Sequence, residues 1–218
     1  IAFATQKFWF NKDVVLYGVL AGLIGMIALM AYYQALATGS MGIVSPIGSL
    51  GVVVPLVYGY LHGDSPTQLQ NIGIVLAIIG VVLASGPEFR GDAKSGPILL
   101  AFLSAAMFGF CILFMAKGGQ INSAATVVMM RVSQVSAMVL VALILRSFGG
   151  LQKQDIPLLA VTGSFDAVAN LFFTAAAGMG MLAIVSVLGS LFPVATGVFA
   201  WWFLKERLAP IQYLGIVV

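Results

Sequence analysis

The chain has 218 residues, of which 61% are hydrophobic and only 8% are charged, and its net charge is +3. Soluble domains carry about 25% charged residues, so this chain has too few polar side chains to cover a water-facing surface. The composition therefore predicts an all-α polytopic membrane protein that is surrounded by a lipid bilayer. Because the basic residues stand singly between apolar runs, we expect no nucleic-acid partner.

The chain has a single cysteine, Cys111, and a single histidine, His62. One cysteine excludes an internal disulfide and a cysteine metal cluster, and we expect Cys111 to be a small buried residue. The lone His62 lies at the end of an apolar run, beside glycine. We therefore expect neither a metal site nor a cofactor.

Seven apolar runs follow one another, and each is close to the ~20 residues that cross a bilayer core. A short polar stretch at 11–13 precedes the first run, and a last run opens at Pro210. The shortest run would have to lie steeply or be inset. The runs are 14–36, 41–61, 69–86, 97–116, 123–146, 156–177 and 181–204.

The octamer Ile43-Val-Ser-Pro-Ile-Gly-Ser-Leu50 returns 141 positions later as Ile184-Val-Ser-Val-Leu-Gly-Ser-Leu191, with six of eight residues identical. Downstream, with a shift of one residue, Gln70-Asn-Ile-Gly73 matches Gln212-Tyr-Leu-Gly215, and Asp64 matches Glu206. Agreement over about 50 residues predicts an internal repeat. A repeat of five helices enters the bilayer in opposite directions in its two copies, as in many secondary transporters.

This repeat predicts how the chain is divided. Residues 1–86 form the first repeat, 87–96 the polar linker, and 97–218 the second repeat. At the same offset, residue 97 maps to a position before Ile1. We therefore expect a fragment of a ten-span protein that lacks the first helix and most of the second, is truncated in the last, and has seven complete spans.

Two serine pairs in the repeated octamer are candidate substrate-binding residues. Ser45 and Ser49 lie on one helix face, and Ser186 and Ser190 repeat that face in the second copy. Nearby prolines free backbone carbonyls, which need partners inside a membrane. We predict that the four serines face a common cavity, whereas the alternative is that these faces only pack helices together. The prolines are Pro46, Pro55 and Pro193.

Asp166 is the one acidic residue deep inside an apolar run. An ionisable residue there is costly and marks a functional candidate. A polar residue recurs every four positions along this run, so we expect a stripe that faces the bundle interior: Thr162, Asp166, Asn170 and Thr174. Arg131 lies at a similar depth and is a possible partner. The pair either fixes helix packing, or Asp166 and Asn170 bind an amino group, or Asp166 exchanges a coupling proton.

Three short segments, Leu191-Phe-Pro-Val194, Phe203-Leu-Lys-Glu-Arg-Leu208 and Gln212-Tyr-Leu-Gly215, together resemble the signature that closes each half of EamA-type transporters of the drug/metabolite transporter superfamily. Arg131 matches an arginine often found early in the second helix of a half. Lys205 replaces the usual glycine, and Asp64 replaces the glutamate of the first copy. The resemblance implies ten helices, both termini in the cytoplasm, and export or exchange of small metabolites, amino-acid-like solutes or drugs.

The favoured function is a secondary transporter that exports a small-molecule substrate by alternating access in the bacterial cytoplasmic (plasma) membrane and has no enzymatic activity. One alternative is a seven-helix receptor or retinal protein, but a retinal protein needs a lysine in mid-membrane, and Lys117 and Lys205 lie at the ends of runs. Another alternative is a membrane-embedded enzyme, which would need clustered carboxylates, whereas those of this chain are scattered. The sequence sets neither the oligomeric state nor the substrate.

Overall fold

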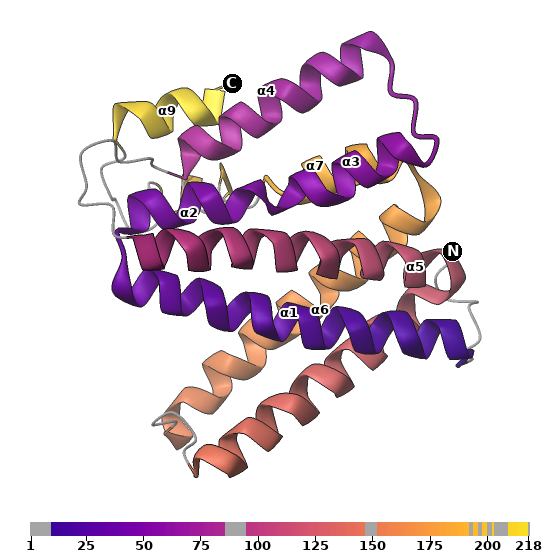
Figure 1. The fold of residues 1–218 in the computed structure, drawn as a ribbon, viewed down its shortest axis with the longest axis vertical. Coiled ribbons are helices and arrows are strands. Elements are labelled where there is room, and N and C mark those ends of the chain that lie inside the picture. Colours follow the sequence, from indigo (N-terminus) through magenta and orange to yellow (C-terminus); the bar gives the residue numbers. More distant parts are fainter. Residues whose placement is uncertain are drawn as a thin grey trace. The chain divides into compact units, whose positions relative to one another are not determined.

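A computed structural model describes residues 10–85, 95–146, 152–191 and 209–217, together with 194, 195, 198, 199 and 202. Every regular element in these ranges is helical, which confirms the all-α class (Figure 1). In chain order the elements are α1 Lys12–Thr38, α2 Met41–Ser49, the short 3-10 helix η1 Leu50–Val52, α3 Val53–Leu61, α4 Gln68–Ala84, α5 Ser95–Leu145, the 3-10 helix η2 Lys153–Asp155, α6 Ile156–Met179, α7 Leu182–Gly189 and α9 Pro210–Val217.

Four helical stretches are long and apolar enough to cross a membrane: Lys12–Thr38, Ile43–Leu61, Ser95–Leu145 and Lys153–Met179. A fifth helix, α4, is equally apolar but has only 17 residues, in agreement with the expectation that this run is the shortest. Apolar helices of this length satisfy all their backbone groups internally, which lipid requires. The described residues therefore have the structure of a polytopic membrane protein.

The runs predicted at 97–116 and 123–146 both lie within α5, which the structure divides at Asn122, whose φ is −158° and ψ is 103°. The backbone is not helical at this residue, so α5 consists of two helices, a first part before Asn122 and a second part after it, in agreement with the two predicted runs. The Asn122 side chain accepts a hydrogen bond from the backbone N–H of Ala125 at 2.9 Å and so caps the second part. The two helices follow each other with this one buried residue between them.

α1 begins earlier than the first predicted run at 14–36. Lys12 and Asp13, which lie in the polar stretch before that run, are already helical. The side chain of Asn11 accepts a hydrogen bond from the backbone N–H of Asp13 at 2.8 Å, which caps the helix one residue earlier than the apolar pattern suggests.

The run at 41–61 is a broken helix. α2 ends at Ser49, three residues of 3-10 helix follow, and α3 begins at Val53. Pro55 lies in the first turn of α3, where its missing N–H leaves the carbonyl of Gly51 without a helical partner. The predicted interruption by proline is therefore present, and it takes the form of a narrowed helical turn.

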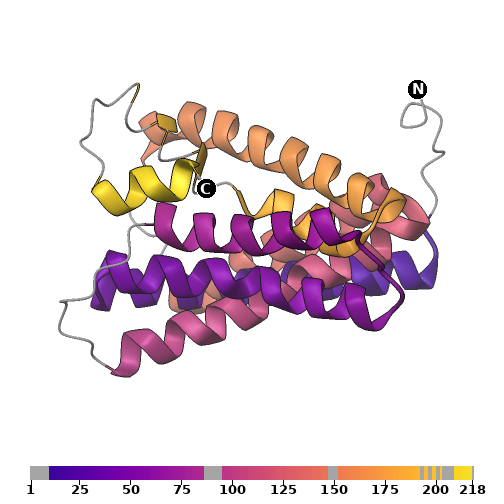
Figure 2. The same ribbon diagram turned by 90° about the horizontal axis from the view of Figure 1, so that it is seen from above.

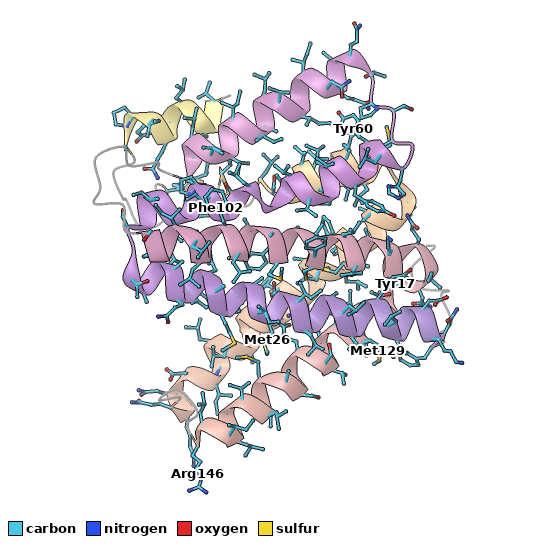
Figure 3. The ribbon with its side chains drawn as sticks, viewed as in Figure 1. Tyr17, Met26, Tyr60, Phe102, Met129 and Arg146 are labelled. Carbon is cyan, nitrogen blue, oxygen red and sulfur yellow. The ribbon has the colours of Figure 1, made fainter. Side chains whose placement is uncertain are left out.

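The described residues fall into two compact units, each considered by itself. The first contains Ile1–Met26 and Leu113–Met179. In it, α1 packs on the second part of α5, where a Cβ on Gly18 would lie 2.6 Å from the Cβ of Met129 (labelled in Figure 3). The first part of α5 meets α6 just before the break at Asn122, where a Cβ on Gly178 would lie 2.6 Å from the Gly119 carbonyl oxygen. Because glycine has no side chain, the two helices approach each other closely at Gly18.

The second unit contains Ile27–Ile112 and Gly180–Val218. Its helices α4 and α9 pack against each other, as do α3 and α7, and α4 also contacts α2 and α7 (Figures 1 and 2). One core cluster joins Val52, Ile74 and Val187, from η1, α4 and α7. The first part of α5 packs closely on the broken helix, because a Cβ on Gly109 would lie 2.5 Å from a Val54 side-chain atom.

Several predictions fall on residues that the structure does not describe. Residues 87–94 of the linker lie outside the described residues, as do Pro193 and the segment 203–208. The linker was predicted to end at residue 96, but α5 already begins at Ser95. Of the run at 181–204, a regular helix is described only for α7.

Candidate functional site

The first candidate site lies in the first unit, where Arg131 and Asp166 form an ion pair. Arg131 comes from the second part of α5 and donates from its Nη2 atom to Oδ2 of Asp166 on α6. The sequence suggested this partner from similar depth alone, and the structure brings the two side chains together. Arginine suits this position because its long stem spans two helices and its charged group is planar.

Two amide side chains complete the cluster. Asn170 lies one turn after Asp166 and donates to Oδ1 of Asp166 at 3.1 Å and to its backbone carbonyl at 2.8 Å. Gln134 accepts from Nη1 of Arg131 at 3.1 Å. Both carboxylate oxygens of Asp166 are therefore engaged by side chains of this chain, and each charge is matched.

Sequence reasoning found Asn170 and missed Gln134. The available signal was its spacing, because Gln134 lies three residues after Arg131 and so on the same helix face. An amide on that face can orient a guanidinium group.

The predicted polar stripe on α6 is only partly interior. Thr174 is fully buried and Asn170 is partly buried, but Thr162 is exposed and 56% of the Asp166 side chain is exposed. The expectation that the whole stripe faces the interior is wrong for its first half. The reason lies in the contact with α5. At Thr174 the backbones meet through Gly119, which has no side chain, whereas at Asp166 the long arginine side chain makes the contact and leaves the carboxylate open.

Arg131 has capacity left for a further acceptor. Its side chain is 29% exposed, yet its Nε atom is buried and makes no hydrogen bond in the described structure. A buried donor of a charged group without an acceptor costs free energy, so an acceptor that reaches it gains affinity. The cluster therefore combines a cation with spare donor capacity and an exposed carboxylate.

The second candidate group lies in the second unit, on α2 and α7. The hydroxyl of Ser49 donates to the carbonyl of Pro46 at 2.7 Å, and the hydroxyl of Ser190 donates to the carbonyl of Val187 at 2.7 Å. These two bonds occupy equivalent places 141 positions apart. Both helices also end there, at Ser49 and at Gly189. The serine of each copy thus closes its own helix.

Ser186 behaves differently from these two. It is 1% exposed, and its hydroxyl makes no hydrogen bond among the described residues. Its counterpart Ser45 is partly buried. A buried hydroxyl without a partner is unfavourable and needs an explanation. The sequence also missed Ser104 on α5, which is fully buried and likewise unpaired in the described structure. That all four serines of the octamers line one cavity stays a prediction.

The glutamines of the two matching segments, Gln70 and Gln212, perform the same local task. The side chain of Gln70 accepts from the backbone N–H of Thr67 at 2.8 Å at the start of α4. The side chain of Gln212 accepts from the backbone N–H of Ala209 at 2.8 Å at the start of α9. A glutamine three residues into a helix can reach back in this way to the residue that precedes the helix. The chemical reason for this part of the repeated motif is therefore helix capping.

In the part of the chain that the structure describes, no group of three or more histidine, cysteine, aspartate or glutamate side chains is placed to hold a metal ion. The polar side chains of the first candidate site are suited to binding a solute. A charge pair with amide neighbours can hold a solute that carries both a carboxylate and an ammonium group, because each solute charge can replace one protein partner.

Comparison with known proteins gives two matches. The model of the EamA-like transporter family matches residues 1–86 and 95–218, which is nearly the whole chain. An uncharacterized protein of Methanocaldococcus jannaschii is 32% identical over 76 residues, which are 34% of this chain and 56% of that protein. The chain thus spans little more than half the length of this relative.

Proposed function

The chain belongs to the EamA-like transporter family, and from this membership we propose that it forms part of a secondary transporter that moves small solutes by alternating access. The apolar helices make it an integral membrane protein. Export is the proposed direction, and the bacterial cytoplasmic (plasma) membrane is the proposed location. The alternatives of a receptor or an embedded enzyme have no comparable support.

The proposed architecture is a pair of inverted five-helix repeats, 1–86 and 97–218. Two local structures support it, because each occurs once in each copy at nearly the same offset. The first is the helix end closed by Ser49 or Ser190, and the second is the helix start capped by Gln70 or Gln212. In transporters with inverted repeats the solute site lies where the two repeats meet, and the residues proposed below would be the contribution of the second repeat to that site.

The proposed solute site is the cluster of Arg131, Asp166 and Asn170, and the observation that carries it is the Arg131–Asp166 ion pair within membrane-spanning helices. Placing a charged residue in mid-membrane costs about 2.5–3.5 kcal/mol on insertion scales, so it is retained where it has a task. A zwitterionic, amino-acid-like solute fits both charges: its carboxylate binds the guanidinium group, and its ammonium group binds Asp166. Asp166 is also the carboxylate we propose for exchange of a coupling proton.

A pair that only fixes helix packing would be shielded by its neighbours. The exposed carboxylate of Asp166 favours binding instead, because it leaves acceptor capacity that packing does not use. Ser45, Ser49, Ser186 and Ser190 remain proposed cleft residues. Among them Ser186 has the strongest claim, since its hydroxyl is buried and unpaired.

The test is Asp166→Asn in the full-length protein, reconstituted in lipid vesicles with radiolabelled neutral amino acids as probes. A hydrogen bond to a charged group contributes about 1.5–3 kcal/mol, so uptake at limiting concentration should fall about 10- to 100-fold. N-acetylated amino acids, which lack the ammonium group, should be taken up poorly by the unchanged protein.

Asp13→Asn is the matched control, because Asp13 is an exposed carboxylate at the start of α1 in the same unit and outside the cluster. It should leave uptake unchanged. If Asp166→Asn transports every probe as well as the control does and with the same pH dependence, Asp166 is not a solute-binding or proton-exchanging residue.

A further inference from the structure

The turn that follows α3 fixes the position of the Asp64 carboxylate. α3 ends at Leu61, His62 caps it, and Gly63 has a φ of +106°. The backbone N–H of Asp64 then donates to the carbonyl of Gly59 at 2.9 Å. This is the longer bond of the Schellman motif, which folds the second residue past a helix back over its last turn. Tyr60, labelled in Figure 3, marks this end of α3.

Asp64 reaches from this turn to another helix of the same unit. Its Oδ2 atom accepts a hydrogen bond at 2.8 Å from the backbone N–H of Ala183. Ala183 is fully buried and is the second residue of α7, whose preceding residue Met181 makes no side-chain cap. The first N–H groups of a helix need acceptors, and a carboxylate suits the positive end of the helix dipole. Asp64 therefore supplies the cap that the local sequence of α7 lacks.

Gly59 is the third member of this contact. A Cβ at Gly59 would overlap Oδ2 of Asp64 and lie 3.0 Å from the backbone nitrogen of Ala183. The absence of a side chain at Gly59 thus lets the carboxylate pass between α3 and the start of α7. The three residues form one contact, named here the α3–α7 latch: Gly59, Asp64 and Ala183.

We propose that the α3–α7 latch is a gate contact, which holds the start of α7 closed on α3 and must open before Ser186 becomes accessible to solute. Ser186 lies three residues after Ala183 on the same side of α7, and its buried hydroxyl has no partner in the described structure. A hydroxyl buried in this state gains its partner when α7 moves. The role as a gate rests on the proposed transport function, but the latch itself rests on geometry alone.

The strength of the contact suits a gate. A single helix cap shifts an equilibrium by about 2- to 30-fold, which is enough to favour the closed state and small enough to be reversed by a bound solute. No other charged side chain is seen within bonding distance of Asp64 in the described residues, so no counter-ion has to leave when the latch opens.

The test measures access to position 186 without any solute. Ser186→Cys is introduced into full-length protein in which Cys111 and every cysteine outside residues 1–218 are replaced by alanine. The labelling rate with a polar, membrane-impermeant maleimide is then measured in vesicles with reagent on both faces. Asp64→Ala and Gly59→Ala should each raise this rate about 2- to 30-fold, and Asp64→Asn, which keeps an acceptor oxygen, should raise it less.

Gly73→Ala is the matched control, because Gly73 lies in the neighbouring helix α4 and a Cβ there meets nothing within 4 Å. It should leave the labelling rate unchanged. Size-exclusion profiles check folding, and if Asp64→Ala does not fold, Gly59→Ala and Asp64→Asn decide the question.

Equal labelling rates in the latch variants and in the unmodified background would overturn the latch, as would an equal increase in Gly73→Ala. The outcome is independent of the uptake experiment on Asp166. If Asp166→Asn leaves uptake unchanged but the latch variants change the labelling rate, the latch is supported and the solute site is not. If Asp166→Asn reduces uptake but the latch variants leave the labelling rate unchanged, the solute site is supported and the latch is not.

Discussion

Two aspartates show two ways of keeping a carboxylate in a membrane protein. Asp64 is held by main-chain geometry: its own N–H bonds to α3, and its side chain bonds to the backbone of α7. Asp166 is held by side chains, those of Arg131 and Asn170. The bond between the Asp64 carboxylate and the start of α7 breaks when the two helices move apart. A contact between side chains can change when a ligand arrives.

This difference separates the two proposed roles. The partners of Asp166 are flexible and partly exposed, so a solute can replace them one at a time while the helices stay in place. The partner of Asp64 is a fully buried helix terminus, so its bond reports the position of α7. We therefore expect variants of Asp166 to change solute binding and variants of Asp64 to change the balance between conformations.

The largest effect is expected from exchanging the charges of the first pair. Arg131→Asp alone places two carboxylates side by side in the membrane, and the amount of inserted, folded protein should fall strongly, because each such charge costs about 2.5–3.5 kcal/mol on insertion scales. Adding Asp166→Arg should restore the folded protein but not the uptake of amino-acid probes, since the surrounding amides then face the wrong charges.

The amount of folded protein is measured with a fluorescent fusion, and uptake is measured in vesicles. The double variant with Arg131→Asp and Asp166→Arg contains the same two side chains at exchanged positions, so it controls for their size as well as for their charge. Full recovery of uptake in the double variant would show that the pair only fixes packing.

The sequence was sufficient for the fold class and for the ion pair. An apolar chain with helix-length runs has few solutions in lipid, and Arg131 and Asp166 are the two charges that lie deep in their runs at similar depth. The matching segments also contain two local structures that the sequence did not predict, the serine bonds at Ser49 and Ser190 and the glutamine caps at Gln70 and Gln212. Local spacing suffices to explain both of them.

The remaining features depend on contacts that spacing does not encode. The two parts of α5 divide at one capping residue, Asn122, and a hydropathy pattern shows two runs there but not the residue at which the helices divide. The α3–α7 latch joins residues 119 positions apart. The sequence showed that Asp64 departs from the family pattern, but only the structure shows that a shorter acid over Gly59 reaches Ala183.

An intermediate effect is expected at Gly63, where alanine would be forced into a φ of +106°. Such strain costs about 1–3 kcal/mol. Gly63→Ala should therefore lower the thermal midpoint by several degrees and also speed labelling at position 186, because the turn no longer places Asp64 correctly. The rate of uptake at saturating solute should change less than the labelling rate at position 186.

Gly73→Ala provides the comparison of opposite sign. It replaces a glycine inside α4 in open space, and alanine favours a helix over glycine by about 0.5–1 kcal/mol. Its thermal midpoint should stay equal or rise. A midpoint for Gly63→Ala as high as that of Gly73→Ala would show that the turn after α3 is not strained by a side chain and does not set the position of Asp64.

The smallest effect is expected at the hydroxyls, to which the same distinction applies. Ser49 and Ser190 are held by the main chain of their own helices, whereas Ser186 is buried with no bond in the described structure. Hydrogen bonds of this kind in membrane proteins contribute about 0.6 kcal/mol on average. Ser49→Ala and Ser190→Ala should thus each lower the thermal midpoint slightly and equally, and leave uptake nearly unchanged.

Ser186→Ala loses no internal bond, so its midpoint should not fall, but uptake should weaken through a higher KM. Thermal scans and uptake kinetics on the three variants measure both quantities. A clear loss of stability in Ser186→Ala with unchanged KM would assign that hydroxyl to packing and leave the repeated serines as structural residues only.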